Sequence, residues 1–561
     1  MPFGLLLIGL AALLLSGCRE STRGTGHSDT GGTIVIATSS EPDALFPPAA
    51  MSMEARQATE LIYEYLADVG VSMNTIGDRG FVPELASRWT WANDSMSIAF
   101  TIHQNAKWQD GRRVSADDVA FTYGIYSDST FAFAGAEDLA DIDSVTVRDS
   151  ATAVFWFAKR TPHQFFDAAA RMLILPRHIL GAIPRDSLRT VTARMTPVGS
   201  GRFRLGGWNR GTSFELDAVA DHYRGRANPD RIIWTIAPEY QTAVTRLLGG
   251  QADVFAALRP ETIAELGGKS RFNVVSLPGM DYVFMQLNLR DASGRDAPHP
   301  LFASRDLRRA LTMAVDRRAM VKNLFDTLAT VSIGPAVRAF PTTDTTLAQI
   351  PFDPAAAGRL LDSLGWRRPA NGGIRMRDGR RLAFTVIVPS SSMSRTRLAV
   401  LMQEQLRQVG AEMNIDQMDY AAFSDLLSGR RFDAALAAWH LGSSPAAVRD
   451  TWTSAAAKKG GLNYGGYRNP AFDNLVDSAL EADRIADTRR YFKQANQMIV
   501  DDAPAIWLYE PRTVLAIEKR VRITPMRPNA WWLDIANWMI PAAERIPRDR
   551  SQAAGQSSRK P

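Results

Sequence analysis

The most constraining feature of the sequence is an alternation of strand-like and helix-like segments between residues 382 and 442. Three apolar runs of strand length, at 382–388, 411–415 and 432–438, are separated by two helical stretches. The first helical stretch carries Leu398, Leu401, Met402, Leu406 and Val409 at three- and four-residue spacing, and Gly410 is suited to a left-handed cap. Parallel strands need such crossovers, so the pattern predicts a βαβαβ unit in an α/β fold.

A ligand site is expected at the carboxyl ends of these strands, where open α/β sheets bind their ligands. The third run ends before Trp439, and the expected strand 33–38 likewise runs into a turn that begins at Ser39. The candidate contacts are therefore Ser39, Ser40, Glu41, Trp439, His440, Leu441 and Gly442. From the later segment alone, an equal alternative is that Trp439 is a core residue and His440 a surface residue.

The length of 561 residues exceeds what one hydrophobic core serves, so two to four domains are expected. Hydrophobic residues make up 45% and charged residues 22% of the chain, as in folded globular proteins. The formal net charge of +6 is spread without a long basic run. Nucleic-acid binding is therefore not indicated.

The N-terminus has the pattern of an export signal. Residues 5–15 are almost wholly apolar, too few to span a bilayer, and their end forms LLLSGC at 13–18 with the only cysteine, Cys18. This run resembles the bacterial lipoprotein box, which implies a signal peptide over 1–17 and a lipid on Cys18, although residues 1–4 lack the usual Lys or Arg. The polar segment 18–32 is expected to be a flexible tether, and 544–561 a disordered tail.

The motifs of common secreted enzymes are absent from the sequence. There is no HExxH, GxSxG or CxxC, and the seven histidines form no pair at metal-ligand spacing. Gly268, Lys269 and Ser270 look like the end of a phosphate-binding loop, but Ile263 stands where its first glycine belongs. No catalytic residue, metal or cofactor is therefore expected, and a secreted hydrolase is a minor alternative.

Seven further motifs lie in order along the chain. They are FVPELASRW at 81–89, KWQDG with ADDV at 107–119, TPVGSGRF at 196–203, LLGGQADV at 247–254, PLFASRDLRRALTMAVDR at 300–317, LLDSLGW at 360–366 and NYGGYRNPAFD at 463–473. As an ordered set they resemble the family 5 extracellular solute-binding proteins, the oligopeptide-, dipeptide- and nickel-binding components of ABC importers. An arginine cluster in and just after the fifth motif is expected to face water; it comprises Arg308, Arg309, Arg317 and Arg318.

The resemblance implies a two-lobed periplasmic-binding-protein fold of the cluster C type, whose lobes close over a ligand. Lobe I would comprise 33–288 and 512–543, with an added subdomain at about 78–194, and lobe II 289–511. The implied protein is a monomeric lipoprotein, periplasmic or at the cell surface, that captures peptides or similar solutes. It would deliver them to an ABC permease and its ATPase. Asn463 and Tyr464, from the last motif, join the candidate ligand contacts.

The peptide binders of this family hold a free amino group with an Asp a few residues after the tryptophan that matches Trp439. Here that segment reads HLGSSP and has no acid. This implies that ligands without a free amino terminus bind at least as well, with Glu41 as the nearest substitute acid. Alternatives are a metal chelate or haem as ligand, or a sensory or scaffolding lipoprotein.

Overall fold

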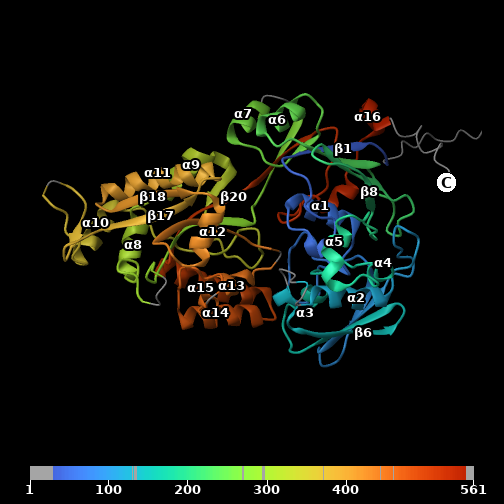
Figure 1. Cartoon of the computed structure of the whole chain (residues 1–561), viewed down its shortest axis with the longest axis horizontal. Coiled ribbons are helices and arrows are strands. Elements are labelled where there is room, and N and C mark those ends of the chain that lie inside the picture. Colours follow the sequence, from blue (N-terminus) through green and yellow to red (C-terminus); the bar gives the residue numbers. More distant parts are fainter. Residues whose placement is uncertain are drawn as a thin grey trace, which may run out of the picture.

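The computed structural model describes residues 30–550, apart from 129–130, 132–135, 268–270, 294–296, 371, 443 and 459. Cys18, the signal segment and the Gly268–Ser270 motif therefore lie outside the described residues. Figure 1 shows two lobes arranged along the long axis of the molecule, each built around a sheet with helices on it. The expected two-lobed α/β architecture is confirmed.

The sheet of lobe I has seven strands in the order β12-β21-β11-β1-β10-β9-β8. Their bounds are β1 Thr33–Thr38, β8 Phe203–Asn209, β9 Ser213–Ala218, β10 Arg231–Ile236, β11 Val254–Phe255, β12 Phe272–Leu277 and β21 Thr513–Glu518. Strand β1 is parallel to both β10 and β11, whereas the outer pairs are antiparallel. The carboxyl ends of three adjacent strands therefore meet at one edge of this sheet.

The sheet of lobe II has six strands in the order β14-β20-β13-β19-β17-β18. Its βαβαβ unit consists of β17 Ala383–Pro389, α11 Met393–Gln408, β18 Glu412–Met418, α12 Tyr420–Ser428 and β19 Ala434–His440. The three strands are parallel, and Gly410 has a φ of 82°, so both expectations are confirmed. Leu398, Met402 and Leu406 are buried, but Leu401 lies on the exposed side of α11.

The third strand ends later than its apolar run. Trp439 pairs with Tyr282 and His440 with Asp281, because β13 (Asp281–Leu287) lies antiparallel beside β19. The other strands of this sheet are β14 (Ala329–Val331) and β20 (Ala505–Pro511). Trp439 and His440 are thus strand residues and not loop residues.

An added subdomain lies between β1 and β8 in the sequence. Its antiparallel sheet runs β4-β5-β7-β6, with β4 Ala86–Trp91, β5 Ser97–Ile102, β6 Ile142–Asp149 and β7 Thr152–Phe157. Helix α2 (Ala116–Tyr126) begins at a capping box. The Ser115 side chain accepts a hydrogen bond from the Asp118 N–H, and the Asp118 carboxylate accepts one from the Ser115 N–H. Two-stranded sheets are formed by β2 Ala67–Asp68 with β3 Val82–Pro83, and by β15 Met376–Arg377 with β16 Arg380–Arg381.

Helices cover the sheets of both lobes (Figure 1). In and around lobe I they are α1 Met53–Ile62, α3 Gln164–Ala169, α4 Arg177–Leu180, α5 Leu188–Thr192, α6 Tyr240–Leu248, α7 Pro260–Gly267 and α16 Pro547–Arg550. In lobe II they are α8 Arg305–Met313, α9 Arg317–Phe325, α10 Pro354–Ser363, α13 Ala447–Trp452, α14 Pro470–Glu481 and α15 Ile485–Asp502. Each lobe has its own buried apolar cluster, so each has a separate core.

The chain passes between the lobes twice. The first passage is at 278–280, between β12 and β13, and the second is at Arg512, between β20 and β21. A Cβ on Gly279 would lie 1.8 Å from the carbonyl oxygen of Pro511, so the two passages touch. Strand β13, expected in lobe I, is a central strand of the second sheet, and the sheet pairing therefore moves the first boundary from 288 to about 279.

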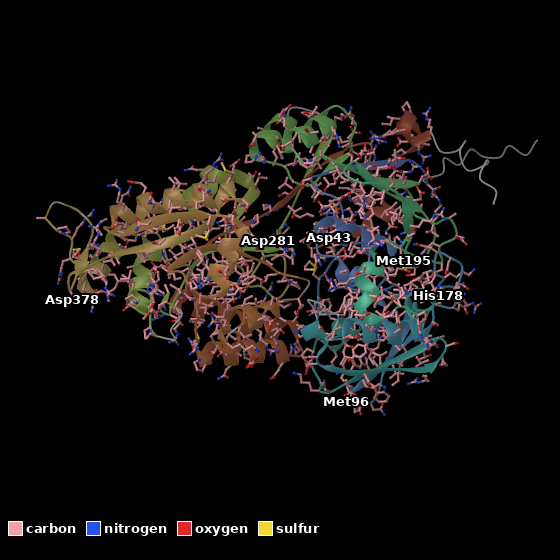
Figure 2. All side chains as sticks on the ribbon, in the orientation of Figure 1. Asp43, Met96, His178, Met195, Asp281 and Asp378 are labelled. Atoms are coloured by element: carbon pink, nitrogen blue, oxygen red, sulfur yellow. The ribbon has the colours of Figure 1, made fainter. Side chains whose placement is uncertain are left out.

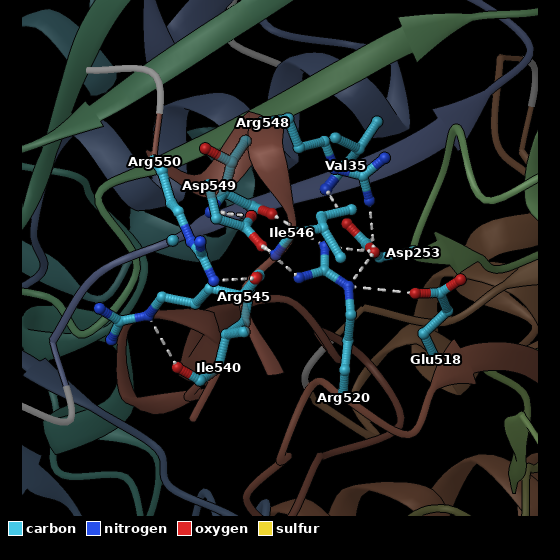
Figure 3. Close-up of polar contacts among 12 residues, drawn as sticks. Val35, Asp253, Glu518, Arg520, Ile540, Arg545, Ile546, Arg548, Asp549 and Arg550 are labelled. Carbon is cyan, nitrogen blue, oxygen red and sulfur yellow. Dashed lines mark hydrogen bonds and ion pairs between the residues drawn. The ribbon is translucent and has the colours of Figure 1, made fainter. Parts of the chain in front are cut away.

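The start of the expected disordered tail is packed against lobe I. Asp549 is 8% exposed, accepts a hydrogen bond from the Thr33 N–H (2.9 Å), and pairs with Arg520 (2.7 Å). Arg520 also pairs with buried Asp253 at 2.6 Å, and Arg548 reaches the same carboxylate (Figure 3). The expectation of disorder from residue 544 is therefore wrong for 544–550, because charged rather than apolar contacts hold this segment.

Candidate functional site

A cavity of about 730 Å³ lies between the two lobes. Lobe I supplies the end of β1 with Ser39, the segments that follow β10 and β11, and the first turn of α1. Lobe II supplies Met280, Asp281 and His440. The volume is within the usual range for a small-molecule site. The cavity thus occupies the edge where the parallel strands of lobe I end.

On the lobe II side, the cavity is lined by a histidine–aspartate pair, of which the sequence indicated only His440. The Nδ1 of His440 lies 3.0 Å from Oδ1 of Asp281, and both side chains are roughly half exposed. Figure 2 shows Asp281 on the side of lobe II that faces lobe I, with Asp43 across from it. Asp281 therefore presents a carboxylate to the cavity, which the segment after Trp439 lacks.

The lobe I side carries a cation that sequence reasoning missed. The guanidinium of Arg259 stacks 4.0 Å from the ring centre of Tyr240, and both residues line the cavity. The Tyr240 hydroxyl accepts a hydrogen bond from the Arg259 N–H (2.9 Å) and lies 2.6 Å from Oγ1 of Thr262. These contacts fix the tyrosine beneath the arginine. Applying the strand-end argument to β10 and β11 would have found both residues.

Glu41 is committed to structure outside the cavity. Its carboxylate accepts hydrogen bonds from the Trp208 Nε1–H (3.0 Å) and the Gly211 N–H (3.1 Å). The hydrogen bond from Gly211 is the main cause of the lowered pKa of Glu41, and the bond from Trp208 lowers it further. Glu41 thus holds the β8–β9 turn, while Ser40 is exposed and only Ser39 of this group lines the cavity.

Trp439 and Tyr464 form a pair of partly buried rings in lobe II. Their ring centres are 5.7 Å apart and the planes are 23° from parallel, which is an offset stack. Neither ring lines the cavity in this arrangement of the lobes. Sequence reasoning selected both residues but gave no sign that they would contact each other.

Three other candidates act as scaffold. Leu441 is 3% exposed within an apolar cluster, and its N–H donates to the Met280 carbonyl (2.8 Å). Asn463 is 2% exposed, and its Nδ2 donates to the carbonyl oxygens of Trp452, Thr453 and Tyr467. Gly442 is exposed with open space at its Cβ position. Asn463 therefore fixes the loop that carries Tyr464.

Metal-binding clusters and membrane-spanning helices are both absent from the described residues. No group of three or more His, Cys, Asp or Glu side chains there is placed to hold a metal ion. In the same part of the chain, no helix is both long and apolar enough to cross a bilayer.

Two lobes, two chain passages and a cavity at strand ends define this molecule as a two-lobed α/β solute-binding protein. The model of the bacterial extracellular solute-binding proteins, family 5, matches residues 80–460, and the chain belongs to that family.

Relatives of known name extend the similarity over nearly the whole chain. The oligopeptide-binding protein AppA of Bacillus subtilis is 26% identical over 94% of this chain and 96% of its own length. The probable D,D-dipeptide-binding periplasmic protein DdpA of Escherichia coli is 24% identical over 87% and 90%.

Solved structures show the same fold. AppA from Bacillus subtilis with a nonapeptide has a TM-score of 0.74 at 23% identity, covering 91% of this chain and 99% of that one. NikA from Brucella suis with Fe(III)-EDTA has a TM-score of 0.76 at 18% identity, with coverage of 91% and 99%.

Proposed function

We propose that this protein captures peptides or peptide-like solutes in the cavity between its lobes and delivers them to the permease and ATPase of an ABC importer. The observation that carries the proposal is a cavity of about 730 Å³ to which both lobes contribute, next to two touching chain passages. The names of relatives that bind oligopeptides and dipeptides support peptides as the solute class.

The charges around the cavity fit a ligand that carries both signs. Arg259 on lobe I can pair with a carboxylate, and Asp281 on lobe II with an ammonium group. A buried ammonium needs such a partner, because leaving it unpaired costs several kcal/mol in a desolvated site. A zwitterionic peptide bound across the cavity would therefore connect the two lobes.

Closure of the lobes would be the output of binding. Ligand contacts to both lobes favour the closed state, and only this difference in affinity shifts the population. The stacked Trp439 and Tyr464 lie in lobe II outside the present lining, and closure would bring them to the ligand.

Native mass spectrometry of the protein purified from its own cells tests the proposal. We expect the purified protein to retain peptides. After these peptides are removed, the same peptides should bind again with a measurable heat in calorimetry. A retained metal chelate or haem would replace peptides as the ligand. Turnover of a peptide library in place of stable binding would contradict the proposal.

We further propose that a lipid on Cys18 anchors the protein to a membrane, in the periplasm or at the cell surface. Several acyl chains hold a protein firmly, whereas one binds only marginally. Cys18→Ser should move the protein from the membrane to the soluble fraction and abolish incorporation of labelled palmitate. Sedimentation of the variant with membranes, together with an unlabelled parent protein, would contradict the anchor.

A further inference from the structure

A second cavity, of about 380 Å³, lies within lobe I, behind the first. It opens between the end of α1, the start of β8 and the segment 525–537. Trp531, which is 4% exposed, lines both cavities. Trp531 is the one residue common to the two linings, so the cavities are neighbours with otherwise different walls.

Carboxylates outnumber cations among the residues that line it. The carboxylates are Glu60, Glu64, Asp68, Glu84 and Asp534, and the arginines are Arg202, Arg224 and Arg527. Asp68 pairs with Arg527 at 2.7 Å, and Glu60 accepts hydrogen bonds from Arg56, Tyr65 and Trp532. These two carboxylates are satisfied within the protein.

Glu64 and Glu84, in contrast, share one guanidinium. Arg224 lies 2.6 Å from Oε1 of Glu64 and 3.2 Å from Oε1 of Glu84. The Glu64 side chain is 2% exposed, and its Oε2 has no hydrogen-bond partner among the described residues. His222 Nε2 lies 3.5 Å from Oε1 of Glu64, and the Tyr223 hydroxyl donates to the same oxygen (3.0 Å). A buried carboxylate oxygen without a partner is costly, so Oε2 is the atom of this pair that a further donor would stabilise.

The pKa of Glu84 is sensitive to nearby charge. Burial raises the pKa of Glu84 to about 7; the charges of Glu64 and Asp68 add to the rise, and Arg224 opposes it. Burial also opposes ionisation of Glu64, but His222 and Arg224 hold the pKa of Glu64 below its ordinary value. Glu84 is therefore only partly ionised near neutral pH, and a cation bound beside it would favour its ionised form.

The rim of the cavity is apolar. Val71 is 68% and Val82 49% exposed, although large apolar side chains are ordinarily covered. Met526 and Leu533 line the same cavity. An apolar rim over an acidic floor suits a molecule with a cationic end and an aliphatic body.

We propose that this second cavity binds a small organic cation, whose charged group pairs with Glu64 and Glu84 and whose aliphatic part contacts Val71 and Val82. Arg202, which could compete for the carboxylates, instead donates to the Asn537 side chain and the carbonyl oxygens of Gly225 and Arg226. The site does not depend on the peptide cavity being occupied.

Calorimetry with 1,4-diaminobutane, and with uncharged 1,4-butanediol as its matched control, tests the proposal. The diamine should bind and the diol should not. Glu84→Gln should weaken diamine binding at least tenfold, which is about 1.4 kcal/mol. Val71→Trp, at an exposed position where folding is not at risk, should block the entrance with a similar loss.

The pH dependence of diamine affinity distinguishes a binding role of Glu84 from a purely structural one. The groups around Glu84 are Glu64 and Asp68, the cation Arg224, and Tyr223 and His222 next to it. Because the cation pairs with ionised Glu84, diamine affinity should rise as the pH is raised from 6 to 8 through the pKa of about 7. The rise should be absent in Glu84→Gln.

Asp281→Asn, a substitution in the first cavity, shows whether the diamine binds in the second cavity or at the proposed peptide site. Diamine binding that is unchanged in Asp281→Asn but weakened about tenfold or more in Glu84→Gln and Val71→Trp supports the second site. Loss through Asp281→Asn, equal binding of diamine and diol, or unchanged binding to a folded Glu84→Gln would each overturn the inference.

Discussion

Asp281 supplies a carboxylate on the lobe II side of the cavity, where the amino group of a bound ligand would need one. It begins β13, pairs in register with His440 of β19, and lines the cavity between the lobes. Glu41, the substitute suggested by the sequence, is held by Trp208 and Gly211 and does not line that cavity. The expectation about the free amino terminus considered only Glu41 and the segment after Trp439, and Asp281 supplies a carboxylate to the cavity from a different strand.

We predict that the protein prefers a peptide with a free amino terminus to its acetylated form by tenfold or more, about 1.4 kcal/mol. Asp281→Asn should remove this preference, because an ammonium group in the closed cavity would then lack its carboxylate. Calorimetry on matched free and acetylated peptides measures the effect.

Glu41→Gln is the control for that experiment and should keep the preference. If the parent protein bound both peptide forms equally, Asp281 would have no role in recognising the amino group. If neither form bound at all, the proposed peptide function would be at fault rather than Asp281.

The element α16 is held by charge at the amino end of β1. Asp549 accepts from the Thr33 N–H (2.9 Å) and the Ile546 N–H (2.8 Å), and it pairs with Arg520 (2.7 Å). Burial raises the pKa of Asp253, which is fully buried, although Arg520 and Arg548 oppose the rise. The network in Figure 3 therefore depends on every charge having its partner.

We predict that Asp549→Ala destabilises this edge of lobe I by about 2 to 4 kcal/mol, because it leaves the Thr33 N–H without its acceptor and removes one of the carboxylates that pair with Arg520. Hydrogen exchange of the β1 and β21 amides should accelerate accordingly. This local readout suits a two-lobed protein, whose lobes need not unfold together.

Glu544→Ala is the matched control, because Glu544 pairs with Arg522 where both side chains are well exposed. Its effect should stay within about 1 kcal/mol. Equal exchange rates in the Asp549 and Glu544 variants would mean that α16 contributes nothing to the sheet edge.

At the scale of the whole molecule, the cavity is lined mainly by lobe I. Lobe II adds only Met280, Asp281 and His440, while the Trp439–Tyr464 stack stays outside the lining. The two passages at 278–280 and Arg512 touch, which places them where a hinge would act.

We predict that a saturating peptide reduces the radius of gyration of the protein in small-angle X-ray scattering, because contacts to both lobes favour the closed state. The Asp281→Asn variant should require more peptide to reach the same compact form. An unchanged scattering profile at a peptide concentration that saturates calorimetry would contradict closure.

Local patterns in the sequence determined the elements and much of the architecture. Apolar periodicity placed β1 at 33–38 and the βαβαβ unit at 382–438, two residues short of the end of β19 at His440. These features depend on residues a few positions apart, so the sequence alone carries them.

Contacts between distant segments were decided only by the tertiary structure. Asp281 meets His440 across 159 positions, and Glu41 meets Trp208 across 167. Arg308 and Arg317, expected in water, are 5% and 7% exposed; Arg308 donates to the carbonyl oxygens that end α15, and Arg317 to that of Ile350. Charge and hydrogen-bonding capacity have no periodicity along the chain, so which partner a polar side chain finds depends on how the sheets bring the segments together.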